Sequence, residues 1–338
     1  MIASAREVSL TGIKPTGEPH IGNFIGAIQP ALKLAEKYES IYFIADYHAL
    51  TSVRDPQLLR HYTRSVAAGW LAAGLDPEQT IFYRQSDLPE TFELNWILAC
   101  MTAKGLMNRA HAYKAARDRN VEAGVADIDA GVNMGLYNYP ILMAVDILIM
   151  ESDVVPVGRD QVQHVEYAAD IAGSFNHVYG KGYTFKIPKA VTPETSTGQV
   201  LPGLDGRKMS KSYNNTIPLF ASSAELKKLI RRVQTDTTAV DAPKDPNSSS
   251  VFLIYEQFAA PDDVADVRRR LVEGGMGWGE LKNIAFEELD RRLTPMRERY
   301  EALMDPGSQL DKLLAEGAAK ARDRAAPVLK AARKAVGI

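Results

Sequence analysis

The stretch LTGIKPTGEPHIGNFIGAI, residues 10–28, decides the fold of this chain. Its first apolar residues are typical of the end of a β-strand, and Gly12, Pro15, Gly17 and Pro19 then form a turn. Apolar residues at helical spacing follow, at positions 21, 24, 25 and 28. The pattern predicts a strand, a glycine-rich turn and a helix whose free N–H groups favour an anion. By itself such a turn favours a packing role, because many α/β proteins use it only for packing.

A second stretch changes that interpretation. Residues 208–212 read KMSKS and follow Gly203 and Gly206, so that two lysines and two serines lie in one polar loop that suits a polyphosphate. A short lysine and serine run alone is usually a solvated loop. Together, however, PHIGN at 19–23 and KMSKS resemble the paired HIGH and KMSKS signatures of class I aminoacyl-tRNA synthetases. Asn23 stands where the last histidine of the first signature would be.

Length and composition describe an ordinary soluble globular protein. With 338 residues we expect one larger and one smaller domain, and 46% hydrophobic and 24% charged residues are unexceptional. The net charge of −2 means that any RNA-binding surface must be a local patch.

The cysteine content narrows the class further. Cys100 is the only cysteine, which excludes an intramolecular disulfide and a cysteine-rich zinc or iron–sulfur site and favours a cytoplasmic location. The N-terminal sequence lacks the apolar core of a signal peptide, and the most apolar segment, 141–150, is too short to span a bilayer.

The first two thirds of the chain alternate between strand and helix patterns. Apolar strands are predicted at 41–45, 80–84 and 153–158, and helices at 56–74, 92–113, 139–150 and from 161. This alternation predicts an α/β fold with a Rossmann-like, doubly wound parallel sheet. We expect residues 109–125 to form an exposed loop near the site, and 186–206 to form the loop that carries KMSKS.

Three polar residues occupy positions that suit a ligand. His48 and Asp160 follow predicted strands, where open α/β sheets bind ligands, although His48 could instead cap the next segment and Asp160 could be a helix N-cap. Asp146 lies inside the apolar helix ILMAVDILIM, so its carboxylate needs a partner. A structural salt bridge and a ligand donor such as an indole N–H both satisfy that need, and both stay open.

Beyond residue 217 the sequence predicts a second, all-helical domain, with helices at 224–233, 251–258, 262–273, 278–300 and 309–335. Basic clusters recur at 231–232, 268–270, 291–292 and 330–334. Each is more often a solvated helix face, but four of them beside a nucleotide site favour contact with tRNA phosphates. For Phe92 and Trp96, on the helix at 92–113, core packing is favoured over a subunit interface.

By this point the chain resembles one family, the bacterial tryptophanyl-tRNA synthetases, over nearly its whole length. Six motifs carry the resemblance: TGIKPTGEPHIGN (11–23), ADYHALT (45–51), RQSDLPE (84–90), YPILMAVDIL (139–148), DVVPVGRDQVQH (153–164) and GRKMSKS (206–212). The resemblance implies a catalytic domain at 1–216, an anticodon-binding domain at 217–308 and a C-terminal helix at 309–338 that packs back on the catalytic domain. It also implies a homodimer that charges tRNA(Trp) with tryptophan in two steps, using ATP with Mg²⁺ on the phosphates and no metal held by the protein.

The resemblance also implies site residues. ATP-binding positions fall on Lys14, Pro15, Thr16, Gly22, Asn23, Gly158, Arg159, Asp160, Val200, Lys208, Met209, Ser210, Lys211 and Ser212. Tryptophan-binding positions fall on Asp146, Tyr139, Met143, Ile147, Val155, Val157 and Gln161. We expect Lys208 and Lys211 to bind the pyrophosphate, and His20 and Asn23 the ATP phosphates. The chain departs from some members at Lys14, where they have glutamine, and at Ala116, where they have a second lysine.

Three alternatives remain at this stage. A tyrosyl-tRNA synthetase is the first, because Asp146 accepts a hydrogen bond from a phenol as well as from an indole. A small nucleotidyltransferase also uses a HIGH-type turn and releases pyrophosphate, but it seldom needs so large a helical domain. A synthetase-like paralogue that binds RNA without catalysis is the third, and the intact Lys208, Lys211, Asp146 and His20 argue against it.

Overall fold

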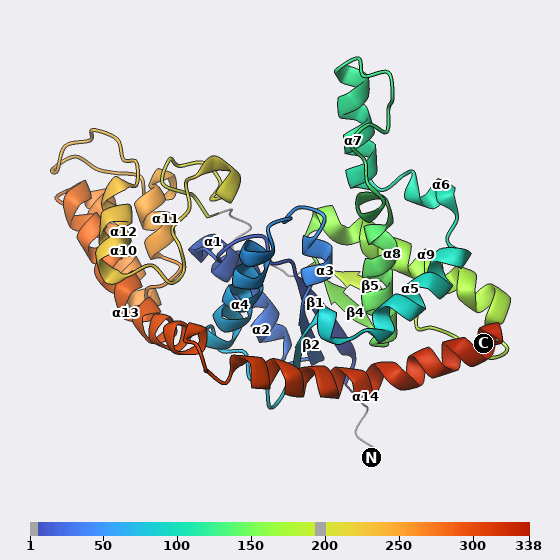
Figure 1. Cartoon of the computed structure of the whole chain (residues 1–338). Helices are drawn as coiled ribbons and strands as arrows, with labels where there is room; N and C mark the ends of the chain where they lie inside the picture. The colour runs from blue at the N-terminus through green and yellow to red at the C-terminus, as the bar shows by residue number, and fades with distance from the viewer. Residues whose placement is uncertain (1–5, 193–200) are drawn as a thin grey trace.

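The computed structural model describes residues 6–192 and 201–338, except for the side chain of Asp160 (Figure 1). Its centre is a parallel sheet in the order β3-β2-β1-β4-β5, which confirms the doubly wound prediction. The strands are β1 (Val8–Ile13), β2 (Glu39–Ile44), β3 (Ile81–Arg84), β4 (Val154–Pro156) and β5 (Lys189–Val191). The prediction of a loop at 186–206 was wrong at β5. A strand of three residues is too short to show the alternation of apolar and polar residues that identifies a strand.

The order of the strands places a ligand crevice. β1 lies between β2 and β4, so the chain reverses its direction of winding at β1, and open sheets bind ligands at the carboxyl ends of the strands at such a point. The glycine-rich turn follows β1 and Gly158 follows β4. Both therefore lie at this edge of the sheet.

The helix after the glycine-rich turn is built in three parts, α1 (Ile21–Asn23), the π-helix η1 (Phe24–Ile28) and α2 (Gln29–Leu34). The helices that complete the α/β half are α3 (Asp46–Ala49), α4 (Pro56–Ala72), α5 (Glu90–Met101), α6 (Lys104–Met107), α7 (His111–Glu122), α8 (Met134–Ile149) and α9 (Val162–Tyr179). Short 3₁₀ turns follow β3 (η2, Gln85–Asp87) and β4 (η3, Arg159–Gln161).

The region between β3 and α8 differs most from the prediction. The helix predicted at 92–113 breaks into α5 and α6, and the loop predicted at 109–125 is mostly α7, which projects from the body (Figure 1). α7 buries only Tyr113 and Ala116, so its sequence lacks the apolar stripe that identifies a packed helix. Core packing was also wrong for Phe92 and Trp96, whose side chains are 44% and 73% exposed.

The part after residue 217 is helical as predicted, with α10 (Ser223–Arg232), α11 (Ser250–Tyr255), α12 (Pro261–Glu273), α13 (Trp278–Met304) and α14 (Leu310–Val336). α10 to α13 gather at one end of the molecule, while α14 runs back along the sheet (Figure 1). α14 packs against β3, and Arg324 Nε donates to Met150 O at 2.7 Å.

Gly317 lets α14 approach the sheet. A Cβ at this position would lie 1.7 Å from Phe82 O, an atom of the β3 backbone that cannot move aside. Gly317→Ala should therefore lower the free energy of unfolding by about 3 kcal/mol, as overpacking does. Urea unfolding measures it, with Gly173→Ala as control, since a Cβ there meets nothing within 4 Å and the helix gains propensity. Equal urea midpoints for wild type and Gly317→Ala would show that α14 does not need this contact.

Candidate active site

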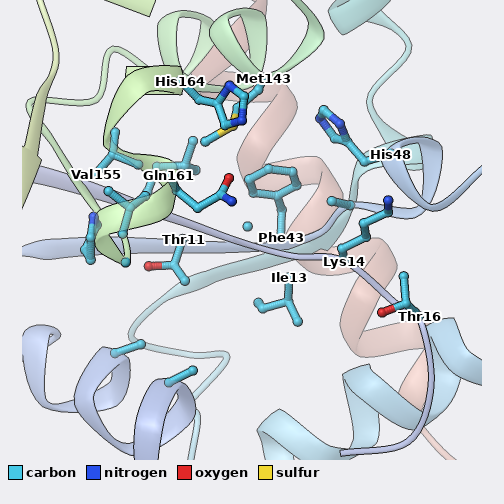
Figure 2. Close-up of a pocket in the computed structure, with 18 of the residues that line it drawn as sticks. Thr11, Ile13, Lys14, Thr16, Phe43, His48, Met143, Val155, Gln161 and His164 are labelled. Carbon is cyan, nitrogen blue, oxygen red and sulfur yellow. The ribbon is translucent and has the colours of Figure 1, made fainter. Parts of the chain in front are cut away.

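A cavity of about 1670 Å³ opens at the crevice between β1 and β4 (Figure 2). Most of the residues implied by the motifs line it together: Lys14, Thr16, Asn23, Tyr139, Met143, Asp146, Ile147, Val155, Val157, Gly158, Arg159, Gln161 and Lys211. Residues that the sequence did not single out as ligand contacts also line it, among them Thr11, Phe43, Thr51, Ala112 and His164. Val200 and the Asp160 side chain lie outside the described part of the chain.

The turn after β1 closes on itself through His20 and Asn23. The Asn23 backbone N–H donates to His20 Nδ1 at 3.2 Å, and the His20 backbone N–H donates to Asn23 Oδ1 at 3.1 Å. Because Nδ1 accepts, the ring proton of the neutral imidazole is on Nε2, which is free to act as a donor. Burial and the nearby Lys211 ammonium lower the pKa of His20 to about 4, so the ring is neutral at pH 7.

The KMSKS loop is bonded to this turn through the segment that follows it. The Ile21 backbone N–H donates to Ile217 O and the Leu219 backbone N–H to Pro19 O, each at 3.0 Å. As a result Lys211 Nζ lies 2.8 Å from where a Cβ at Gly17 would be. The two motifs, far apart in the sequence, therefore meet at one end of the cavity.

The other residues of the KMSKS loop lie beside the cavity. Met209 is buried, with its sulfur 3.4 Å from where a Cβ at Gly22 would be, and Lys208 is exposed. Ser210 Oγ and Ser212 Oγ are 2.8 Å apart. None of the predicted residues His20, Pro15, Gly22, Lys208, Met209, Ser210 and Ser212 is among the described residues that line the cavity.

Asn215 shapes this loop, although no pattern in the sequence predicted a role for it. Its side chain accepts from the Ser210 backbone N–H at 2.8 Å and donates to Lys208 O at 3.0 Å, and the residue is only 2% exposed. Its sequence context, YNNT, looks like an ordinary turn, so no pattern marks the role.

The other end of the cavity is an apolar recess around Asp146, which is 2% exposed. Its carboxylate accepts hydrogen bonds from His48 Nε2 at 2.9 Å and from Gln85 Nε2, which lies 2.9 Å from both oxygens. Burial raises the pKa of Asp146, and these bonds act in the opposite direction. The buried carboxylate of Asp146 is thus partnered by two donors, His48 and Gln85. Of these two, His48 also lines the cavity.

Lys14 adds a cation between the two ends. Its Nζ donates to Thr51 Oγ1 at 2.8 Å, and burial lowers the pKa of Lys14. Figure 2 shows Lys14 and His48 on the same side of the cavity. Lys14 therefore supplies a positive charge to the wall of the cavity.

These contacts define the chemistry that the cavity accepts. One end of the cavity has cations and the start of a helix, which suit a polyphosphate. The other end has a buried carboxylate in an apolar recess, which suits a ring that carries one hydrogen-bond donor. The described residues hold no group of three His, Cys, Asp or Glu side chains that could bind a metal ion. They also form no helix long and apolar enough to cross a membrane.

Comparison with known proteins agrees with this geometry. Residues 5–294 match the family model described as tRNA synthetases class I (W and Y). The chain is 54% identical to the tryptophan–tRNA ligase of Pseudomonas aeruginosa over 332 residues, which is 97% of this chain and 73% of that protein. It is 49% identical to the tryptophan–tRNA ligase of Neisseria meningitidis over 331 residues, 97% of both chains.

A solved structure is similar over the whole chain. The crystal structure of tryptophanyl-tRNA synthetase from Campylobacter jejuni complexed with ADP and tryptophan superimposes with a TM-score of 0.88 at 39% sequence identity. The match covers 98% of this chain and 100% of that one.

Proposed function

The chain belongs to the tryptophan–tRNA ligases among the class I tRNA synthetases, and we infer that it activates L-tryptophan with ATP and transfers it to tRNA(Trp). It is an ATP-dependent aminoacyl-tRNA ligase. The observation that carries the inference is the buried carboxylate of Asp146 at the end of the cavity opposite Lys211. That arrangement fits an indole N–H at one end and a triphosphate at the other.

The recess around Asp146 supports the choice of amino acid. The tryptophan ring lies among Tyr139, Met143 and Ile147 of α8 and Val155 and Val157 at the end of β4, and its N–H donates to Asp146. Gln161, which also lines the cavity, contacts the amino acid's polar end. A site built to accept a ring donor strongly rejects analogues that lack it.

The opposite end supports the nucleotide. Residues 14–16, Gly22 and Asn23 of the turn after β1, residues 158–160 after β4, and Val200 with residues 208–212 then bind ATP. Mg²⁺ would be bound through the oxygens of the triphosphate, which are ligands of the kind that it prefers. Neutral His20 donates to a phosphate oxygen through Nε2.

The chemistry follows from these positions. The tryptophan carboxylate attacks the α-phosphorus of ATP, the bond to the β,γ-pyrophosphate breaks, and tryptophanyl-adenylate forms. No protein nucleophile is needed, so catalysis consists of positioning and of stabilising the charge on the departing pyrophosphate, chiefly by Lys211. In the second step the 3′-terminal ribose of tRNA displaces AMP.

ATP–pyrophosphate exchange with each of the twenty amino acids tests the function. We expect tryptophan to support exchange far better than tyrosine, and purified tRNA(Trp) to be charged. Exchange with tyrosine would identify the tyrosine branch of the family. Exchange with no amino acid would indicate a nucleotidyltransferase or a non-catalytic paralogue.

The helical half supports binding of the tRNA anticodon arm. Of the basic clusters, those at 268–270 and 291–292 are engaged in ion pairs, for example Arg269 with Asp266 and Arg291 with Glu288. Arg231 and Arg232, in the last turn of α10, take part in none of the ion pairs among the described residues. We therefore propose 1–216 as the catalytic domain, 217–308 as the anticodon-binding domain and 309–338 as the helix that packs back on the catalytic domain. We assign the phosphate contact to α10.

The exposed face of α5 supports a homodimer. Phe92, Trp96 and Cys100 are exposed and recur at intervals of four residues, so they form one stripe on that helix. Trp96→Glu should raise the dimer dissociation constant at least about 100-fold, as loss of a buried aromatic anchor does. Sedimentation equilibrium measures it. Val272→Glu, an exposed apolar residue on α12, is the control, and an unchanged dimer in Trp96→Glu would place the interface elsewhere.

A further inference from the structure

Gln85 supports Asp146 from the protein side of the recess. It follows β3 directly, it is 1% exposed, and its Nε2 lies 2.9 Å from each oxygen of the Asp146 carboxylate. Asp146 lines the cavity, whereas Gln85 is not among the described residues that line it. Gln85 therefore approaches the carboxylate without occupying the space of a ligand.

The rest of the Gln85 amide indicates what the residue is for. Its Oε1 is buried and has no hydrogen-bond partner among the described residues. An unsatisfied buried acceptor costs about 1–3 kcal/mol, so the side chain is kept here for the N–H that it donates to Asp146. The opposite orientation of the amide would turn Oε1 toward the carboxylate, and two acceptors would then face each other.

The hydrogen bonds around Asp146 leave room for one more donor. A carboxylate has about four lone-pair sites. One N–H of Gln85 Nε2 is shared between both oxygens, and His48 Nε2 donates to Oδ2 at 2.9 Å, so these contacts use one lone pair of Oδ1 and two of Oδ2. The remaining lone pair is on Oδ1. Because Asp146 lines the cavity, this lone pair can accept from a ligand.

We propose that Gln85 is a positioning residue for substrate specificity: it holds Asp146 as an ionised acceptor with one lone pair available to the indole N–H. This proposal rests on the proposed function of the site. Without the N–H groups of Gln85, burial would favour the protonated carboxyl, which presents a donor where the indole also presents a donor. The titratable groups around Asp146 are His48 of α3, which lowers the pKa of Asp146, and the fully buried Tyr83 of β3, whose own pKa is raised by burial and by the Asp146 carboxylate.

The test replaces Gln85 by methionine, which has a similar shape and no N–H. In ATP–pyrophosphate exchange we expect KM for tryptophan to rise about tenfold, as the loss of a hydrogen bond to a charged group predicts, with KM for ATP within about twofold. The acid limb of kcat/KM for tryptophan should move to higher pH by about one unit, because hydrogen bonds to the charged form lower a carboxyl pKa. Preference for tryptophan over 3-benzothienylalanine, which has sulfur in place of the N–H, should fall about tenfold.

Two further variants make the test decisive. Gln79→Met removes the same kind of bond, from Gln79 Nε2 to Asp76 at 2.9 Å, on the exposed surface and should leave all three quantities at wild-type values. Gln85→Glu keeps the shape if Gln85→Met does not fold, and its second carboxyl should also move the acid limb to higher pH. An acid limb and an analogue preference that stay at wild-type values in a folded Gln85 variant would overturn the proposal. Failure of wild type to use tryptophan would instead overturn the proposed function.

Discussion

Lys211→Ala is expected to lower the rate of tryptophanyl-adenylate formation by roughly 10²- to 10³-fold, the usual effect of removing one group that stabilises developing charge. Lys211 lines the cavity, and its Nζ lies 2.8 Å from where a Cβ at Gly17 would be, beside the turn that follows β1. Charge grows on the pyrophosphate only as the bond to the α-phosphorus breaks. The variant should therefore lose kcat in ATP–pyrophosphate exchange.

Tryptophan affinity separates this effect from general damage to the site. Asp146 lies at the opposite end of the cavity, so calorimetric titration should give a dissociation constant for tryptophan within about twofold of wild type. Lys208→Ala should lose less activity, because Lys208 is exposed and does not line the cavity, and Lys181→Ala, on the surface, should lose none. An unchanged exchange rate in Lys211→Ala would remove this lysine from the mechanism.

The sheet and its ligand crevice could be predicted because their signals are local. Runs such as 41–45 and 80–84 are long enough to show a buried strand, and the alternation with helices fixes a parallel sheet. β5, with three residues, gives no such signal. The prediction for α7 was wrong for another reason: a helix that projects into solvent buries few side chains, so its sequence has the polar pattern of a loop.

The site could be predicted only in part, for a reason of distance along the chain. That a carboxylate within an apolar helix needs partners follows from Asp146 alone. Which partners it has does not, because His48 is 98 residues away and Gln85 is 61 residues away. The order of the strands brings them together. The only local sign is that each follows the end of a strand, a position shared by many residues that bind nothing.

Trp96 shows a similar limit. An apolar residue at helical spacing indicates that one face of a helix is covered, but not whether the same chain or another covers it. The exposure of Phe92 and Trp96 decides against the chain's own core.

Asp146→Ala is expected to lower kcat/KM for tryptophan by about 10³-fold, since sites that hydrogen-bond a substrate donor discriminate by roughly 10⁴- to 10⁵-fold against analogues that lack it. The substitution removes the acceptor and also leaves the N–H groups of His48 and Gln85 without their carboxylate. For 3-benzothienylalanine, which has no ring donor to lose, kcat/KM should fall only about tenfold. ATP affinity should stay near wild type, because the phosphate end of the cavity is untouched.

Asp146→Asn provides the version of this experiment that preserves shape. An amide has one acceptor oxygen, and its NH₂ group would face the donors of His48 and Gln85. The preference of the Asp146→Asn enzyme for tryptophan over the sulfur analogue should therefore also fall, by about 10²-fold or more. Circular dichroism and the urea midpoint establish that each variant is folded before the kinetics are compared. If Asp146→Asn kept the wild-type preference while folded, the carboxylate would serve only to hold His48 and Gln85. The ring N–H would then be recognised by another group in the cavity.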